Sequence, residues 1–291
     1  MRIRITVFVT ALAAIFAASA FSLGRKTDYA EVRVGSYNIR MSGMDKASPD
    51  NNWSVRKERL WTSIENCRFD VFGLQEVSSE AQEDLEERFS DVFGLYFFSP
   101  YSEDGNGDKA QGVMYRKDLF ELLEVHNFWI GPDPYVMSRS DVGSKGNYNR
   151  GGFCGIFMHK PTGIRFFFMN THGSLNEEAK LNYAGVFEQV ERRYNPESLP
   201  SVFVGDFNVK PDHGMYEVIT SYWNDSHLDS PVKNGPVNTF NAWKHPEGDR
   251  RIDFIFYRSG AEPIVYCCDN TLYDGLYPSD HFPLYTDFRI R

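Results

Sequence analysis

The segment 201–208 constrains the fold of this 291-residue chain more than any other. Its β-branched and aromatic residues are typical of a buried strand. The apolar run stops at Gly205, where the backbone can turn, and Asp206 and Asn208 follow. Because side chains alternate along an extended chain, these two polar side chains share one face while Phe207 points into the core. The segment therefore predicts a strand that presents a carboxylate and an amide at its end.

Further strand-like and helical segments alternate along the chain on both sides of this segment. Apolar runs predict strands at 31–39, 69–74, 112–116, 122–130, 153–159, 164–170, 239–243, 252–257, 264–268 and 284–290. Helical spacing and capping boxes predict helices at 54–66, from Ser79 and from Ser174. Several strands between Leu122 and Asn170 lack an intervening helix, which favours antiparallel hairpins. This order predicts an α/β fold in which two mixed β-sheets pack face to face with helices outside.

Most of these strands end in polar residues. They are Asn38, Glu76, Asn170 with His172, Asp206 with Asn208, Asp253, and Asp280 with His281. Each has an ordinary structural explanation on its own, as a turn residue, a helix cap, a surface histidine or an ion-pair partner. Six polar ends on otherwise apolar strands are harder to explain in this way, because binding sites gather at such ends. We therefore expect these residues to form one site.

The chemistry of this set favours phosphoester hydrolysis. Attack on a phosphate needs neutralised charge, a positioned water and help for the leaving oxygen. Glu76, an amide oxygen and a second carboxylate offer only oxygen ligands, which suit Mg²⁺. The sequence has no His/Cys set of the zinc type, no Gly-rich phosphate loop and no G-x-S-x-G elbow.

Residues 1–20 have the pattern of a secretory signal peptide. Arg2 and Arg4 precede an uncharged run from Ile5 to Phe21, and residues 18–20 supply the small side chains of a cleavage site. An N-terminal membrane anchor is the alternative, but the Ala-rich run is near the short limit for spanning. We expect residues 21–30 to form a linker and residues 31–291 a catalytic domain. The mature chain would be periplasmic or extracellular, with no integral membrane segment.

The net charge narrows the class of partner, and the cysteines leave two structural alternatives. The net charge is −9, and removal of residues 1–20 with their two arginines leaves −11. A strongly acidic protein is a poor generic nucleic-acid binder, because that affinity depends largely on phosphate neutralisation. Cys67, Cys154, Cys267 and Cys268 lack metal-site spacing. They could form disulfides in an exported protein, or they could be small buried apolar residues.

Six motifs, in this order, together resemble the endonuclease/exonuclease/phosphatase superfamily, which includes nucleases, sphingomyelinases and phosphatases. They are Ser36-Tyr37-Asn38-Ile39-Arg40, Leu74-Gln75-Glu76-Val77, Asn170-Thr171-His172, Gly205-Asp206-Phe207-Asn208, Arg251-Ile252-Asp253-Phe254 and Ser279-Asp280-His281-Phe282-Pro283. The chain is most similar to exported bacterial members. The resemblance implies a four-layer α/β sandwich that hydrolyses phosphoesters. It also implies that Glu76 is the principal ligand of Mg²⁺, or of Mn²⁺, with Asn38 and Asp280 nearby.

The same resemblance implies catalytic roles for five residues. Asp206, held with His281, would orient and deprotonate the attacking water. Asn208 and His172 would contact the phosphate, and Asp253 would fix the site or orient a histidine.

Two positions depart from the pattern of the family. Nucleolytic members carry a glutamate just before the strand at 112–116, paired with the histidine that matches His172. Lys109 occupies that position here, so leaving-group protonation by a carboxylate-backed His172 is in question. Exported relatives follow the Asn-Thr-His motif with an Asp-His pair, where this chain has Gly173 and Ser174. The two changes suggest a different substrate pocket.

Three functions fit these features. The first is a secreted Mg²⁺-dependent phosphoesterase that hydrolyses a phosphodiester by in-line attack of water. The second is a phosphomonoesterase for a polyphosphorylated or lipid headgroup, which a compact pocket lined by Arg150 and Lys145 would favour. The third is a catalytically silent binding protein, which ranks lowest because Asp206 and His281 are both present. We expect a monomer that binds a small-molecule, nucleic-acid or lipid phosphoester, with Arg150 and Asn170 contacting it.

Overall fold

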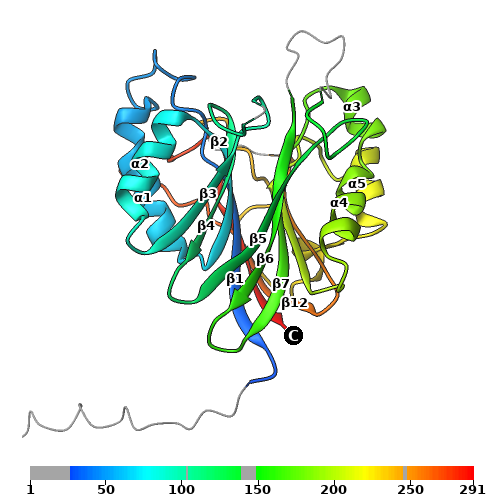
Figure 1. Cartoon of the computed structure of the whole chain (residues 1–291). Coiled ribbons are helices and arrows are strands. Elements are labelled where there is room, and N and C mark those ends of the chain that lie inside the picture. Colours follow the sequence, from blue (N-terminus) through cyan, green and yellow to red (C-terminus); the bar gives the residue numbers. More distant parts are fainter. Residues whose placement is uncertain (1–26, 103, 139–148, 245–247) are drawn as a thin grey trace, which may run out of the picture.

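The computed structural model describes residues 27–102, 104–138, 149–244 and 248–291. Its two β-sheets pack face to face, and helices cover the outer face of each sheet (Figure 1). This arrangement confirms the predicted four-layer α/β sandwich with two mixed sheets. The predicted signal peptide, residues 1–20, lies outside the described residues, as does Lys145. Within the described ranges, no helix combines the length and the apolar character needed to cross a membrane.

The first sheet has seven strands. Their order is β10 (Val232–Asn234), β12 (Ala261–Cys268), β13 (Leu284–Ile290), β1 (Ala30–Asn38), β2 (Val71–Val77), β4 (Ala110–Arg116) and β3 (Phe93–Phe98). Strands β1 and β2 run parallel, whereas β13 and β4 are antiparallel to them. Helices α1 (Trp53–Cys67) and α2 (Ser79–Phe89) cover the outer face and bury an apolar cluster that includes Trp61 and Phe72.

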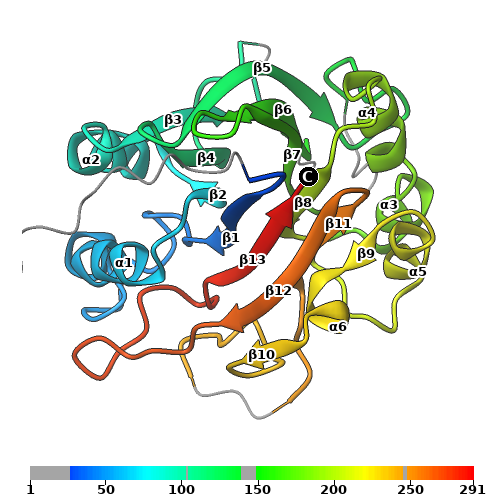
Figure 2. The same cartoon turned by 90° about the horizontal axis from the view of Figure 1, so that it is seen from below.

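The second sheet has six strands. Their order is β5 (Phe120–Trp129), β6 (Gly151–His159), β7 (Ile164–His172), β8 (Ser201–Asp206), β11 (Asp253–Arg258) and β9 (Asn224–Asp225). Helices α3 (Glu177–Asn182), α4 (Val186–Tyr194) and α5 (Gly214–Thr220) lie on its outer side, opposite α1 and α2, as the view along the strands shows (Figure 2). A short helix, α6 (Ser226–Asp229), follows β9.

The side chains of β8 alternate between its two faces, and this alternation shows how the sequence forms the layers. Val202 and Val204 belong to the core between the two sheets, whereas Phe203 belongs to the core under α4 and α5. All three side chains are fully buried. Because a strand covered on both faces is buried throughout, a continuous apolar run is what its sequence needs.

The strand register brings the polar strand ends together. Asn38 at the end of β1 lies beside Gln75 of the parallel strand β2. In the other sheet, Asp206 pairs with His172 of the parallel strand β7 and with Asp253 of the antiparallel strand β11. The candidate site therefore lies where the carboxyl ends of β1, β2, β7 and β8 meet.

Three local predictions were wrong. The segment 239–243 is no strand: Phe240 makes an isolated bridge to His281, and Ala242 and Trp243 have positive φ angles that end any extended run. The helix predicted from Ser174 begins after Asn176, whose side chain accepts a hydrogen bond from Ala179 N, and it is broken into α3 and α4. The capping box predicted at Ser79 is displaced by one residue: α2 begins at Ser79 as predicted, but its N-cap is Ser78.

The structure also contains elements that the sequence patterns did not predict. Strand β3, with its run of half-buried residues, pairs with β4 at the sheet edge, and α5 follows the Asp206 segment. All four cysteines are free: Cys67, Cys154 and Cys268 are buried and Cys267 is half-buried. Of the two alternatives for the cysteines, the structure favours small buried side chains.

Candidate active site

Asp206 lies at the centre of the polar cluster, and its side chain is almost fully buried. Its Oδ2 accepts a hydrogen bond from Asn38 Nδ2 at 3.0 Å, and its Oδ1 accepts one from Asn208 N at 2.9 Å. His172 Nε2 lies 3.5 Å from Oδ2, on the side of β7. Burial, and then the negative charge of Asp253, raise the pKa of Asp206 to about 7. A carboxylate of this pKa can accept and release a proton near neutral pH.

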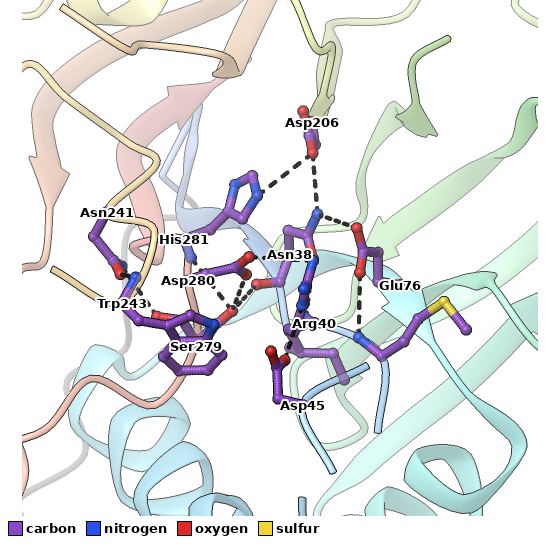
Figure 3. Close-up of polar contacts among 12 residues, drawn as sticks. Asn38, Arg40, Asp45, Glu76, Asp206, Asn241, Trp243, Ser279, Asp280 and His281 are labelled. Carbon is purple, nitrogen blue, oxygen red and sulfur yellow. Dashed lines mark hydrogen bonds and ion pairs between the residues drawn. The ribbon is translucent and has the colours of Figure 1, made fainter. Parts of the chain in front are cut away.

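His281 lies between two buried carboxylates. Its Nδ1 is 2.9 Å from Asp253 Oδ2, and its Nε2 is 3.8 Å from Asp206 Oδ2 (Figure 3 shows the contact with Asp206). Thr239 Oγ1 donates to Asp253 Oδ2 at 2.6 Å and so fixes that carboxylate. Burial by itself would lower the pKa of His281, but the charges of Asp253 and Asp206 outweigh it and raise the pKa to about 10. His281 is therefore a fixed cation at neutral pH.

His172 has the opposite character. Burial lowers its pKa well below the usual value, and the positive charges of Arg150, His281 and Lys109 act in the same direction. The imidazole is therefore neutral at pH 7. Lys109 adds a positive charge near His172, at a position where the resemblance implies a glutamate in nucleolytic members.

A second group of oxygen donors lies on the other side of Asn38. Glu76 Oε1 is 3.3 Å from Asn38 Nδ2, and Glu76 Oε2 accepts from Met41 N at 3.2 Å (Figure 3). Asp280 Oδ2 lies 3.3 Å from the Arg40 guanidinium, and burial raises the pKa of this carboxyl group. Asn38 thus connects two sets of residues: the acid–histidine cluster of Asp206, Asp253, His172 and His281, and the Glu76 group, which consists of Glu76, Asp280 and Asn38 itself.

The backbone at Glu76 is arranged to expose its carboxylate. The pairing of β2 with β4 shifts between Leu74 and Val77, and Glu76 has a φ of 59°. A bulge with a non-glycine residue in the left-handed region costs roughly 1–3 kcal/mol, which is typical of functional positions. The bulge turns Glu76 into the pocket instead of continuing the ladder.

The Glu76 group fits a hard divalent cation. Glu76, Asp280 and Asn38 offer oxygen atoms from three segments. Within the described residues Glu76 makes two hydrogen bonds, both longer than 3.1 Å. Oxygen-only donors of this kind suit Mg²⁺ or Mn²⁺. Asn38 Oδ1 accepts from Arg40 N at 3.0 Å, so a ligand role for this residue requires a turn of its amide.

Asp206, Asp253 and His281 form a further group of potential metal ligands among the described residues, with one ligand atom of each within 4.8 Å of the others. In this group, however, both Asp253 oxygens lie within 3.1 Å of His281 Nδ1, and the positive charge of the imidazole already balances a carboxylate. The Glu76 group is therefore the better candidate for the metal.

Two predicted substrate contacts differ in their surroundings. Asn170 is fully buried and donates to Leu74 O at 2.9 Å and to Gly112 O at 3.0 Å, while accepting from Gln75 Nε2 at 2.7 Å. These bonds tie β7 to the opposite sheet and use the polar atoms of the amide. Asn208 is half-buried, and its Nδ2 donates to Gly173 O at 3.3 Å. Asn170 thus stabilises the packing of the two sheets beneath the site, and its amide is already used in these hydrogen bonds.

A pocket of about 240 Å³ opens beside the two groups. Its lining residues are Arg40, Met41, Met44, Glu76, Tyr101, Lys109, Arg150, His172 and Leu175. Arg150 is only 7% exposed, and its Nε has no hydrogen-bond partner. In the part of the chain that the structure describes, its guanidinium makes no ion pair either.

Arg56 is a supporting residue that sequence reasoning missed. Its guanidinium is fully buried in α1 and donates to the carbonyl oxygens of Ile39, Arg40 and Pro278. Burial lowers its pKa to about 10, so it stays charged. It holds the segments that carry Asn38 and Asp280. An arginine on the otherwise buried face of a predicted helix was the signal that could have identified it.

Comparison with known proteins agrees with this geometry. The model of the Endonuclease/Exonuclease/phosphatase family matches residues 35–281. A protein of that family from Bacteroides thetaiotaomicron has a similar structure, with a TM-score of 0.83 and 24% identity over 91% of this chain and 100% of that one. A mannosyl-6-phosphatase from the same species has a TM-score of 0.79 and 26% identity over 88% of this chain and 99% of that one.

A match among curated proteins is the CCR4-Not complex 3'-5'-exoribonuclease subunit Ccr4 of Debaryomyces hansenii. It is 22% identical over 82% of this chain. This chain covers 36% of that protein, and it spans less than half the length of the curated relatives it matches. The family match, by contrast, extends over most of the chain. The chain therefore belongs to the endonuclease/exonuclease/phosphatase family.

Proposed function

We propose that this chain is a divalent-metal-dependent phosphatase that hydrolyses phosphate monoesters by attack of water. Members of its family are phosphoester hydrolases that use divalent metals. In this chain Glu76 would hold Mg²⁺ or Mn²⁺ together with Asp280 and Asn38. The observation that carries the choice of an anionic substrate is the buried guanidinium of Arg150.

An unpaired buried cation needs a partner. Charged groups with little exposure are normally paired, because leaving one unpaired costs several kcal/mol. Arg150 lines the pocket that also contains Glu76 and His172. A phosphate bound there would supply the missing negative charge and accept charge-assisted hydrogen bonds from the guanidinium.

The acid–histidine cluster supplies the base. Asp206, whose pKa is about 7, would take a proton from the attacking water while the hydrogen bond from Asn208 N orients its carboxylate. His281, charged and fixed by Asp253, would stabilise the carboxylate form of Asp206 and orient it. A bound divalent cation would neutralise charge on the phosphate oxygens. His172, being neutral, could donate a hydrogen bond to the phosphate without adding charge.

The charges around the pocket favour a monoester over the diester that the sequence placed first. A phosphate monoester carries about −1.5 to −2 charges at pH 7, whereas a diester carries one. Lys109 and Arg150 put two cations near His172. At position 109 the resemblance implies a carboxylate in nucleolytic members. The similar mannosyl-6-phosphatase structure supports the same choice. Diester hydrolysis is the second candidate, supported by the match to an exoribonuclease subunit.

We also propose, from residues 1–20 alone, that the protein is exported, and from its single domain that it acts as a monomer. Cleavage after Ala20 would be visible by mass spectrometry of the secreted or periplasmic fraction.

A substrate panel with Mg²⁺ and with EDTA tests the proposed function. It would contain p-nitrophenyl phosphate, bis-p-nitrophenyl phosphate and a short RNA. We expect metal-dependent hydrolysis that is fastest for the monoester. Arg150→Gln should raise KM for the monoester about tenfold or more, because a hydrogen bond to a charged group is lost. Arg150→Lys should recover part of the loss, and Arg192→Gln, at an exposed position, should have no effect. Full activity in EDTA, or a diester rate above the monoester rate, would contradict the proposal.

A further inference from the structure

The residues that line the pocket beside the catalytic groups are of two kinds. Five carry charged or ionisable side chains: Arg40, Glu76, Lys109, Arg150 and His172. The other four carry large and mainly apolar side chains: Met41, Met44, Tyr101 and Leu175. Leu175 and Met44 are 62% and 58% exposed, so this enzyme keeps large apolar side chains in contact with water at the rim of its pocket. Exposed apolar side chains that are grouped at a pocket, unlike single ones scattered over the surface, are typical of ligand-binding grooves.

The position of Leu175 follows from the backbone path after the Asn170-Thr171-His172 motif. A Cβ atom at Gly173 would lie 2.4 Å from the carbonyl oxygen of Phe207, so this backbone path requires glycine. Gly173 N donates to Asp206 O at 2.7 Å and ties the path to the end of β8. Ser174 is buried, and the next side chain is the exposed Leu175. The backbone path therefore places an apolar side chain at the edge of the pocket.

The lining offers little to a sugar. Sugar hydroxyl groups are recognised by hydrogen-bonding side chains, either neutral (Asn, Gln, Ser, Thr) or charged. Among the described residues the lining has none of the four neutral types, so only its charged residues remain for this purpose. Tyr101 has a hydroxyl group, but the face of its ring lies 4.9 Å from Lys109 Nζ. The charged residues are suited to the phosphate and the metal. The part of the substrate beyond the phosphate thus meets apolar side chains.

The size of the pocket limits what lies inside it. A volume of about 240 Å³ is below the roughly 300–1,000 Å³ of pockets that enclose a drug-sized ligand. It can hold the phosphate and the first atoms of the alcohol, and the rest must extend across the rim formed by Met44 and Leu175.

We infer that the alcohol portion of the substrate is apolar: the site takes a phosphate monoester of an alkyl or acyl-bearing alcohol in preference to a sugar phosphate. The inference rests on the proposed function and adds the chemical class of the substrate. The apolar group could belong to a soluble alkyl phosphate or to the phosphate headgroup of a membrane lipid. Both sources share the same chemistry at the pocket.

A chain-length series tests the inference with little change in leaving-group chemistry. Ethyl, butyl and hexyl phosphate would be compared with glycerol phosphate and mannose 6-phosphate. We expect kcat/KM to rise about two- to fourfold for each added methylene group until the chain passes the rim. The gain in kcat/KM should come mainly from a lower KM, because the apolar contacts are the same in the ground state and in the transition state. A flat series, or faster hydrolysis of the two polar esters, would overturn the inference while leaving the phosphatase function intact.

Substitutions at the rim provide the matched comparison. Leu175→Ser and Met44→Ser should each flatten the chain-length dependence, with hexyl phosphate losing about three- to tenfold in kcat/KM and ethyl phosphate less than twofold. Leu228→Ser removes an equally exposed apolar side chain, 58% exposed on α6 and outside the pocket, and should change neither. An unchanged slope in both rim variants would count against the inference.

Two further experiments distinguish a lipid from a soluble ester, and a wrong substrate class from a wrong proposed function. Faster hydrolysis of phosphatidate in vesicles than of hexyl phosphate would assign the apolar group to a lipid, and the reverse order would assign it to a soluble ester. If no monoester is hydrolysed with metal present, the proposed function fails. Calorimetry with methyl- and hexylphosphonate still tests the pocket in that case: tighter binding of the hexyl compound, with a negative heat-capacity change, supports the inference, and equal binding overturns it.

Discussion

Asp206 and Asp253 lie directly opposite each other on the antiparallel strands β8 and β11, and the imidazole of His281 approaches both carboxylates. Two carboxylates at facing positions repel each other, and burial strengthens that repulsion. The positive charge of His281 offsets it, because each imidazole nitrogen faces one carboxylate. Asp206 can therefore be buried and still lose its proton near neutral pH.

This relationship predicts that Asp206 and His281 act as one unit. Asp206→Asn and His281→Ala should each lower kcat by about 10² to 10⁴, with a smaller change in KM. The double variant should be little worse than the poorer single variant. Kinetics measured beside the melting temperature would separate catalysis from stability. Near-normal kcat in well-folded Asp206→Asn protein would remove the catalytic assignment.

The same pair makes stability depend on pH in protein kept free of metal with EDTA. The folded chain binds protons more tightly, because the pKa of Asp206 rises from 3.8 to about 7 and that of His281 rises from 6.5 to about 10. The contribution of Asp206 is therefore full below pH 3.8 and is lost as the pH rises to about 7, and the contribution of His281 is full below pH 6.5 and is lost as the pH rises to about 10.

We therefore expect the free energy of unfolding in urea to fall as the pH rises through this range. The variant with both Asp206→Asn and His281→Gln should have a weaker pH dependence. Stability that increases with pH over the same range would disagree with the two shifts.

Metal binding should depend on Glu76. Glu76→Gln keeps the size of the side chain and removes its negative charge, so affinity for Mg²⁺ or Mn²⁺ should fall by at least about tenfold. Direct titration by calorimetry gives the affinity without an activity assay. Glu87→Gln, an exposed substitution on α2, serves as the control. An unchanged affinity would shift the metal to the Asp206, Asp253 and His281 group.

Lys109→Glu introduces the carboxylate that the family resemblance implies for nucleolytic members at this position. It removes one of the charges that lower the pKa of His172, so that pKa should rise, which NMR titration can follow. The ratio of diester to monoester kcat/KM should increase as well, because the pocket loses a cation and gains a carboxylate. Lys160→Glu makes the same change of charge at an exposed position on the surface. A ratio unaffected by Lys109→Glu would mean that this position does not set the substrate class.

Arg56 should couple stability to metal affinity. Arg56→Met removes the donor to three buried carbonyl groups, each costing about 1–3 kcal/mol when left unsatisfied. We expect a lower melting temperature and weaker Mn²⁺ binding, since the segments that carry Asn38 and Asp280 lose their common support. Arg192→Met, at an exposed position, should affect neither property. Lower stability with normal metal affinity would limit Arg56 to a packing role.

The sequence by itself determined the layers and the inventory of the site. Period-two alternation and apolar runs are local properties, so strands such as 201–206 and the residues at their ends could be identified without a structure. Since sites gather at strand ends, Asp206, Asp253, His281 and Glu76 could be grouped in advance. The strand prediction for segment 239–243 was wrong because the positive φ angles of Ala242 and Trp243 cannot be recognised from their residue types.

Only the tertiary structure decided which of these residues touch. Asn170 faces Gln75 and the opposite sheet, a contact between residues 95 positions apart that no local pattern encodes. Arg150, Met44 and Leu175 share one pocket although they come from three distant segments. Side-chain contacts depend on strand register and on rotamers chosen by close packing. Sequence periodicity fixes which face a side chain occupies, whereas its partner across the fold is set by how the two sheets pack.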